Sequence, residues 1–314
     1  MKISHERGDK YRFDGFPGLA EALIAKLIEV SSLFYDVRWR ISYDLSDDND
    51  ITAGEGIHSY TLNALTGTPN LLQKIASLPF LPHDDDVETQ AFLHSIGQIN
   101  EAGLILRNMI LLEENAVYVS KLPLVRDVIT ILLCLPNTSP AIIELQHYAL
   151  EIAEQLTKYY VLDGQDSFYI SLVRYLQHTS DRGAIITTLR ALSRISMALE
   201  VSNSLREIPV KILRQISDWL LVEDEELRNA CLDFLYQYTA SIYNVETLLQ
   251  NVNMDALMGQ LVRLLTYNAV VDERKERARP QSKHTPPPSK PPKLSHDIVE
   301  QLNQLEEPER SSQW

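Results

Sequence analysis

The apolar positions between residues 209 and 239 recur at the spacing of two consecutive amphipathic helices. Pro209 suits the start of a helix, where its missing N–H is not needed. The apolar face of this first helix holds Leu213, Ile216 and Leu220. The acidic run 223–226 is typical of the next helix N-terminus, where carboxylates meet unpaired N–H groups and the positive end of the helix dipole. The second helix carries a wide apolar stripe, which predicts packing between two neighbours: Leu227, Ala230, Cys231, Phe234, Leu235 and Tyr238.

This pair of helices repeats along the chain. In the first helix of each pair, apolar positions recur 43, 44 and 44 residues apart: Leu133, Leu176, Leu220 and Leu264. In the second helix they recur 44, 39 and 43 residues apart: Leu106, Leu150, Leu189 and Leu232. Self-similarity at roughly 40 to 47 residues, with two or three helices per unit, is the signature of armadillo and HEAT repeats. The sequence therefore predicts an all-α fold, an armadillo-like or HEAT-like right-handed helical solenoid.

The residues before the repeats differ from them in composition. Residues 1–14 are polar and predict no packed element. Residues 15–83 are expected to form N-terminal helices that cap the solenoid, with an acidic loop at residues 44–56. The armadillo-like repeats are expected to occupy residues 84–271.

The residues after the repeats predict a linker followed by one short helix. Residues 272–293 contain six prolines and seven Lys or Arg, so they predict a disordered, Pro-rich basic linker. Residues 294–314 predict one short helix that leads toward a following domain outside this chain.

Charge and composition narrow the function classes. Glycine is sparse, with 11 residues, and alternating Val, Ile and Thr runs are absent, which favours helices over sheets. The net charge of −14 lies on residues 1–271, because the linker at +4 and the last 21 residues at −4 cancel. An acidic body is a poor partner for phosphate backbones, so we expect no direct DNA binding by the array. DNA binding through the basic linker is a separate hypothesis, which salt-dependent binding of the isolated tail would test. The longest apolar run, 128–135, is too short to cross a membrane.

Motifs for catalysis or cofactor binding are not found. The chain lacks a nucleophile elbow, a phosphate-binding loop and an H-E-x-x-H zinc motif, and its eight histidines are dispersed. Cys134 and Cys231 lie on apolar helical faces, where packing is their expected role. We therefore predict a non-enzyme that uses no cofactor, metal or small-molecule substrate.

A helical solenoid can bind partners through an extended surface and needs no catalytic site to do so. The last helix of each unit lines the concave face, and stacking places equivalent positions in a ladder. The alignment of the repeats predicts this candidate partner-binding ladder: Arg107, Leu111, Glu151, Gln155, Arg190, Arg194, Asp233 and Gln237. At any one position, a solvated helix face is the slightly better explanation. If the ladder binds a peptide, charge reversal at Arg190 and Arg194 is expected to weaken binding of that partner without lowering the melting temperature of the protein.

The stretch DWLLVEDEELRNACLDFLYQYT at residues 218–239, followed by NVETLLQNV and QLVRLLTYNAV, resembles the armadillo-like region of subunit nine of the fungal RSC chromatin-remodelling complex. The animal counterpart is the ARID-bearing subunit of PBAF. The resemblance spans about residues 10 to 271. In this family a basic, proline-rich linker precedes an RFX-type winged helix, and EEPERSSQW looks like the approach to it. The ARID and winged-helix domains are expected outside this chain, so their DNA binding is not implied for it.

The resemblance implies a non-catalytic nuclear scaffold that holds other subunits around a Snf2-type ATPase. The alternative is a free-standing armadillo-type adaptor that binds peptides. Adaptors of that kind tend to show a regular Asn or Trp ladder, and the ladder Leu111, Gln155, Arg194 and Gln237 lacks one. This absence favours subunit packing over capture of varied cargo.

Overall fold

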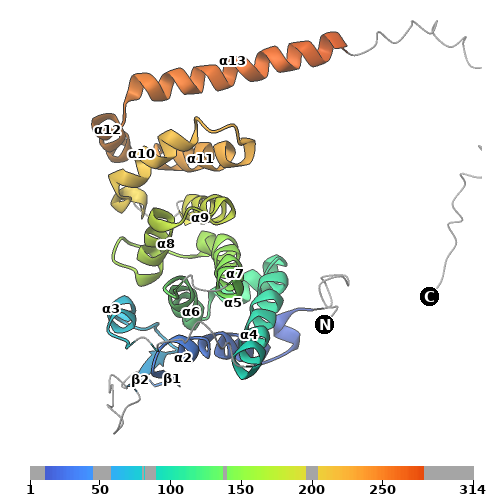
Figure 1. Cartoon of the computed structure of the whole chain (residues 1–314), viewed down its shortest axis with the longest axis vertical. Helices are drawn as coiled ribbons and strands as arrows, with labels where there is room; N and C mark the ends of the chain where they lie inside the picture. The colour runs from blue at the N-terminus through green and yellow to red at the C-terminus, as the bar shows by residue number, and fades with distance from the viewer. Residues whose placement is uncertain are drawn as a thin grey trace, which may run out of the picture. The chain divides into compact units, whose positions relative to one another are not determined.

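A computed structural model of the chain describes residues 11–44, 58–79, 81, 90–136, 140–195 and 204–278. These residues are mostly helical (Figure 1). The chain divides into two units, Met1–Gln260 and Leu261–Trp314, which we describe separately.

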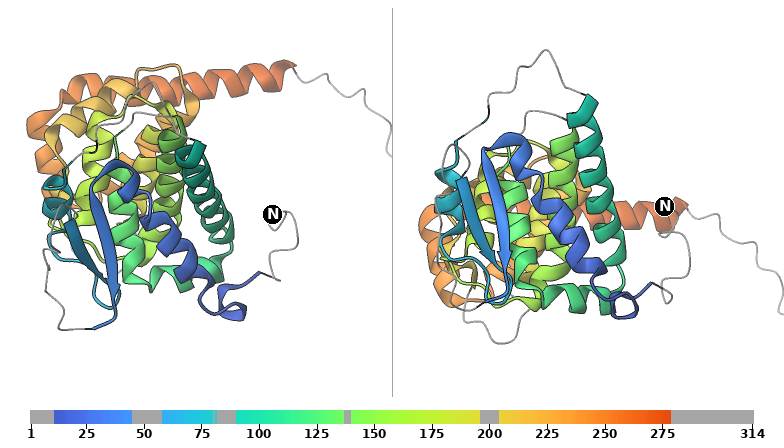
Figure 2. Two further views of the ribbon diagram at one scale, coloured as in Figure 1. Left: turned by 60° about the horizontal axis from the view of Figure 1, so that its bottom comes forward. Right: turned by 90° about the horizontal axis from the view of Figure 1, so that it is seen from below.

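The N-terminal elements combine short helices with a pair of strands. They are a 3₁₀ turn at Phe13–Gly15, α1 (Leu19–Ile28), α2 (Ser31–Phe34), β1 (Val37–Ser42), β2 (His58–Asn63) and α3 (Leu71–Ala76). The strands pair in parallel, with Val37 opposite His58 and Ser42 opposite Asn63. Figure 2 shows the two strands, in blue, running side by side.

The strand pair corrects the expectation of helices alone across residues 15–83. β1 alternates between the inward Val37 and Trp39 and the exposed Arg38 and Arg40, which is the period of a strand. That signal covers only six residues, and its partner β2 lies on the far side of the predicted acidic loop. Of that loop, residues 44–56, only Asp44 is among the described residues.

The rest of the first unit consists of helices in two interlocking rows. One row contains α4 (Gln90–Met109), α7 (Pro140–Leu156), α9 (Arg182–Ile195) and α11 (Glu225–Tyr238). The second contains α6 (Pro123–Leu133), α8 (Ser167–His178), α10 (Val210–Trp219) and α12 (Ile242–Asn251). Each helix packs against the next in its row, and α6, α8 and α10 also pack against α7, α9 and α11 (Figures 1 and 2). The helix α5 (Glu113–Ser120) joins α4 to α6.

The predicted helix pair at residues 209–239 is confirmed as α10 and α11. All six positions of the predicted apolar stripe on α11 are buried. Asp224, from the acidic run, caps α11 by accepting a hydrogen bond from the N–H of Leu227 at 3.1 Å. Pro209 lies one position earlier than predicted, as the N-cap of α10.

Two buried asparagines form the same hydrogen-bonded connection between consecutive helices, one after α4 and the other after α11. The side-chain amide of Asn115, in α5, donates to the carbonyl of Met109 at the end of α4, at 3.0 Å. Asn244, in α12, donates to the carbonyl of Tyr238 at the end of α11, at 2.9 Å. Each amide closes the last turn of one helix from the first turn of the next. The two asparagines are 129 residues apart, which is three periods of 43.

The last helix, α13 (Met254–Ala278), extends beyond the predicted boundary at residue 271. The linker was expected to begin at residue 272, but residues 272–278 are helical. They read DERKERA, whose Glu, Arg, Lys and Ala are strong helix formers, and the first proline comes at Pro280. The remainder of the predicted linker and the predicted short helix at 294–314 lie outside the described residues. None of the described helices combines the length and the apolar character that a membrane span requires.

Candidate partner-binding surface

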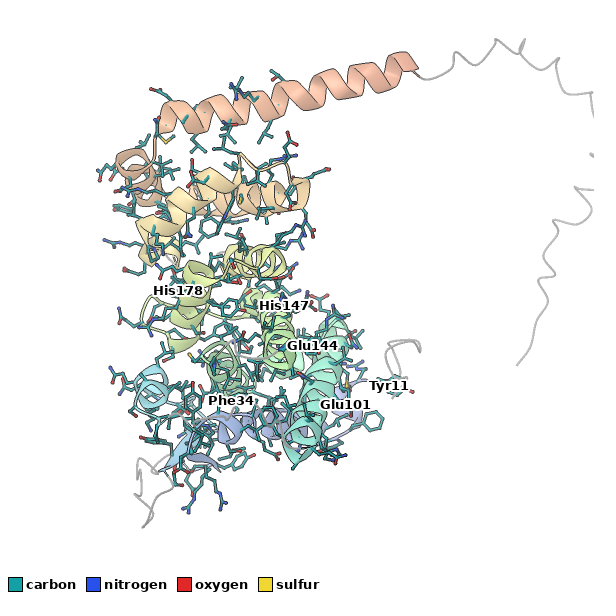
Figure 3. All side chains as sticks on the ribbon, in the orientation of Figure 1. Tyr11, Phe34, Glu101, Glu144, His147 and His178 are labelled. Atoms are coloured by element: carbon teal, nitrogen blue, oxygen red, sulfur yellow. The ribbon has the colours of Figure 1, made fainter. Side chains whose placement is uncertain are left out.

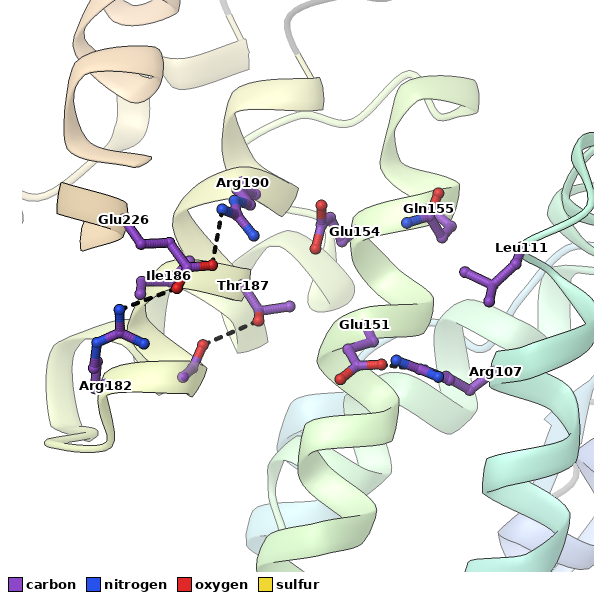
Figure 4. A pocket seen from close by; sticks show the side chains of 11 residues that line it. Arg107, Leu111, Glu151, Glu154, Gln155, Arg182, Ile186, Thr187, Arg190 and Glu226 are labelled. Atoms are coloured by element: carbon purple, nitrogen blue, oxygen red, sulfur yellow. Dashed lines mark hydrogen bonds and ion pairs between the residues drawn. The ribbon is translucent and has the colours of Figure 1, made fainter. Parts of the chain in front are cut away.

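All eight residues of the predicted ladder line one of two adjoining hollows along the first row of helices. The first hollow, of about 320 Å³, is lined by five of them: Arg107, Leu111, Glu151, Gln155 and Arg190 (Figure 4). The second, of about 360 Å³, is lined by Arg190, Arg194, Asp233 and Gln237. Glu154 and Arg190 line both hollows. We call the combined lining the ladder surface.

Four helices contribute to the ladder surface because each packs against the next in the first row. Arg107 lies in the last turn of α4, and Leu111 follows it in the turn before α5. Glu151 and Gln155 are one helical turn apart on α7, and the other two pairs are spaced in the same way on α9 and α11. The eight positions therefore lie on neighbouring helices of the first row or in the turn after α4, and their role in binding a partner stays a prediction.

The charged side chains of the ladder surface pair with each other between helices. Arg107 on α4 pairs with Glu151 on α7. Arg194 on α9 reaches back to α7, where it contacts the Glu154 carboxylate at 3.0 Å and donates to the Glu154 backbone carbonyl at 2.8 Å. Each of these contacts ties one helix of the row to the next.

A third set of contacts joins α9 to α11. Arg190 contacts the carboxylate of Glu226 at 3.2 Å, and Arg182 contacts the same carboxylate at 3.0 Å (Figure 4). Arg182 also donates to Asp224, the N-cap residue of α11, at 2.9 Å. The hydrogen bond from Arg182 is the main reason why the pKa values of both Asp224 and Glu226 lie below the ordinary range.

Glu154 is the most enclosed charge on this surface, with a side chain only 13% exposed. Its burial raises the pKa of its carboxyl, and the nearby Arg194 counteracts that rise. A carboxylate in this position depends on its arginine partner, because an unpaired buried charge is costly.

This pairing changes one expectation from the sequence. Charge reversal at Arg190 and Arg194 was expected to leave the melting temperature unchanged. Arg194, however, binds both a nearly buried carboxylate and a backbone carbonyl of the neighbouring helix. Reversing its charge would place two carboxylates together, so the structure indicates a loss of stability.

The sequence analysis did not identify the partners Glu154, Arg182 and Glu226. It assigned Glu226 to the helix dipole alone. A signal was present in the spacing, since Arg107 and Glu151, like Arg182 and Glu226, are 44 residues apart and opposite in charge. Opposite charges one repeat apart on the same helix face therefore predict ion pairs between stacked helices.

Some other side chains of the ladder surface are exposed to solvent. Leu111 is 61% exposed and Tyr236 is 76% exposed. Within the described part of the chain, no hydrogen bond or ion pair engages the side chains of Gln155 or Asp233. The ladder surface thus presents apolar and hydrogen-bonding side chains between arginines and carboxylates that neutralise each other. No three His, Cys, Asp or Glu side chains among the described residues are grouped as a metal ion requires.

Comparison with known proteins identifies a subunit of a chromatin-remodelling complex as a relative of this chain. It is the chromatin structure-remodeling complex subunit rsc9 of Schizosaccharomyces pombe, with 33% identity over 217 residues. The match covers 67% of this chain and 27% of the relative, so the chain corresponds to about a quarter of that protein. No family model matches the chain. The chain contains an rsc9-related region, and the resemblance stated from its sequence is confirmed.

Proposed function

We propose that this chain is a non-catalytic scaffold subunit of a nuclear, ATP-dependent chromatin-remodelling complex. In this proposal the first unit is an armadillo-like, right-handed solenoid whose ladder surface binds other subunits of the complex. A Snf2-type ATPase is among the partners that we expect.

The packing supports a solenoid. Two rows of helices advance together, each helix contacting the next in its row, as repeats that bury their apolar faces against neighbours do. The hydrogen bonds of Asn115 and Asn244 join consecutive helices in the same way, and the two residues are three repeat lengths of 43 residues apart. Ion pairs connect α4 to α7, α7 to α9, and α9 to α11.

The observation that carries the proposal is the convergence of eight predicted residues from four repeats onto two adjoining hollows. A solvated helix face would not require these positions to share a hollow. The relative rsc9 is named as a subunit of a chromatin-remodelling complex. In such a complex, this surface would bind neighbouring subunits.

The ion pairs also favour a protein partner over a nucleic acid. The four arginines of this surface form ion pairs with Glu151, Glu154, Glu226 and the adjacent Asp224; they are Arg107, Arg182, Arg190 and Arg194. They are therefore not free to displace the counterions of phosphates, on which nucleic-acid binding depends.

Affinity purification of the tagged protein from nuclear extract tests the proposal, with mass spectrometry to quantify what is recovered. We expect a remodeller ATPase and core subunits in stoichiometric amounts, and their loss when residues 84–271 are deleted. Recovery of diverse, substoichiometric proteins by the wild type would contradict the proposal and support the adaptor alternative. The wild-type result decides between the two, even where the deletion also disrupts folding.

A further inference from the structure

A larger hollow of about 590 Å³ lies on the second row of helices, between α3, the end of α6, and α8. We call it the α3–α8 hollow. It shares no lining residue with the ladder surface, and Figure 1 shows α3, α6 and α8 along one side of the unit, with α4, α7 and α9 along the other. Its volume falls within the roughly 300 to 1,000 Å³ typical of binding clefts.

The floor of the α3–α8 hollow is apolar and its walls are helix faces. The floor is formed by side chains that are largely buried, namely Ile75, Leu78, Leu133 and Leu135. One wall presents Leu72 and Ala76, four residues apart on α3, and the other presents Arg174 and His178, four residues apart on α8. Two helix faces that enclose an apolar floor form a groove into which the side chains of a third helix can pack.

The polar groups at the rim are held in place. The Tyr35 hydroxyl donates to the Cys134 carbonyl at 3.4 Å, and the Tyr175 hydroxyl donates to Gln146 at 3.3 Å. The Nδ1 atom of His178, which is labelled in Figure 3, lies 2.7 Å from the carbonyl of Arg174. These contacts fix the walls before a partner arrives, which reduces the entropy that binding would cost.

The charge of the hollow is opposite to that of the chain. Arg174 and His178 are its exposed ionisable residues, and no Asp or Glu is found among the described residues that line it, although the chain carries a net charge of −14. Within the described part of the chain Arg174 forms no ion pair, whereas each arginine on the ladder surface has a carboxylate partner. An apolar floor beside an unpaired arginine complements an apolar side chain next to a carboxylate.

We propose that the α3–α8 hollow binds an acidic amphipathic helix of another subunit. Two apolar side chains of that helix, one turn apart, enter the hollow above Leu133 and Leu135. A carboxylate beside them pairs with Arg174. Recognition thus follows the helix-in-groove mode, with the arginine setting the direction of the helix.

Cysteine labelling on the purified complex tests this inference. Ala76 is exposed and lines the hollow, so Ala76→Cys supplies a thiol whose maleimide labelling rate reports occupancy. We expect that rate to fall at least about tenfold in the complex relative to the chain alone. Arg174→Glu should restore the rate to within about threefold of the free chain, and Arg174→Lys should not, because it keeps the positive charge. Arg174 is exposed and forms no ion pair with any residue that the structure describes, so these variants are expected to fold like the wild type.

A photo-crosslinking residue at Leu72 in the same complex identifies the occupant. We expect crosslinks to a subunit segment with two apolar residues three or four positions apart and an adjacent Asp or Glu. Equal labelling rates in the complex and the free chain, or crosslinks to a segment without a carboxylate, would overturn the inference. So would protection already present in the chain alone, which would indicate an occupant from the chain itself or from a second copy.

The inference rests on the proposed function in one respect, that the partner is a subunit which co-purifies with the chain. Failure of the proposed function and failure of this inference give different results. If no subunits co-purify, the proposed function fails and this inference fails with it. If subunits co-purify while the thiol at position 76 stays fully reactive, only the α3–α8 hollow is excluded as a binding site.

Discussion

Replacing Arg194 should destabilise the first unit by uncoupling α9 from α7. We expect Arg194→Met, which keeps the apolar stem of the side chain, to lower the free energy of unfolding by about 2 kcal/mol. The variant loses a charge-assisted contact to the Glu154 carboxylate at 3.0 Å and a hydrogen bond to a backbone carbonyl at 2.8 Å. It also leaves a carboxylate that is only 13% exposed without its partner. For a unit of this size, the melting temperature should fall by about 4 to 8 °C.

Arg12→Met is the matched control. Arg12 forms an ion pair with Asp14 at 3.0 Å, but the two side chains are 48% and 57% exposed. Exposed pairs contribute little, so this variant should change stability by less than about 0.5 kcal/mol. Both variants can be measured by urea unfolding monitored by circular dichroism, with the slope of the transition checked for constancy.

The pH dependence separates the loss of an ion pair from a general packing defect. Burial already raises the pKa of Glu154, and removing Arg194 removes a group that lowers it. The folded variant therefore holds the Glu154 proton more tightly than the unfolded chain, so the contribution of this group to stability is greatest at acid pH and is lost as the pH rises through its folded pKa. The deficit relative to wild type should shrink between pH 7 and pH 5. Equal losses for Arg194→Met and Arg12→Met, or a deficit independent of pH, would refute the role assigned to this contact.

Three further predictions concern other buried polar groups. Burial raises the pKa of Asp127 to about 6, despite hydrogen bonds from Thr68, so the contribution of this group to wild-type stability should decline by about 2 kcal/mol as the pH rises from 4 to 6. Asp127→Asn should remove that decline in urea titrations at several pH values, and an unchanged pH profile would contradict the assignment. Asn115→Ala should cost about 1 to 3 kcal/mol, because the carbonyl of Met109 and the N–H of Phe13 lose a buried partner; a thermal shift no larger than that of an exposed Asn→Ala variant would count against this hydrogen-bonded connection. Burial raises the pKa of the Cys231 thiol to about 12, so it should react with maleimide only after unfolding, and rapid labelling in the native state would disprove its packing in α11.

The sequence predicted the helical class because that class depends on local periodicity. The stripe on α11 follows from the 3.6-residue period alone, and all its members are buried. The ladder residues follow from the repeat period, since stacked helices bring equivalent positions side by side. Leu264, the last member of the first register, lies in the second unit, and it is α12 that packs against α10.

The features that the sequence did not predict depend on contacts between distant segments. β1 and β2 pair across an intervening segment, so six alternating residues could not identify the partner strand. The ion pairs of Glu154 and Glu226 depend on the direction of side chains between helices, which a leucine register does not specify. The extension of α13 to Ala278 was missed because the proline content of the whole segment outweighed the helix-forming residues at its start.

The most direct test of the central claim changes the ladder surface without breaking its ion pairs. Leu111→Glu adds a charge at a 61% exposed position of the first hollow, and Leu65→Glu does the same at a 48% exposed position outside the hollows. Both tagged proteins would be purified from nuclear extract, and the recovery of each subunit would be quantified per chain by mass spectrometry. If the ladder surface binds subunits, recovery should fall about tenfold or more for Leu111→Glu and stay at the wild-type level for Leu65→Glu. Wild-type recovery for both variants, with melting temperatures unchanged, would contradict the account.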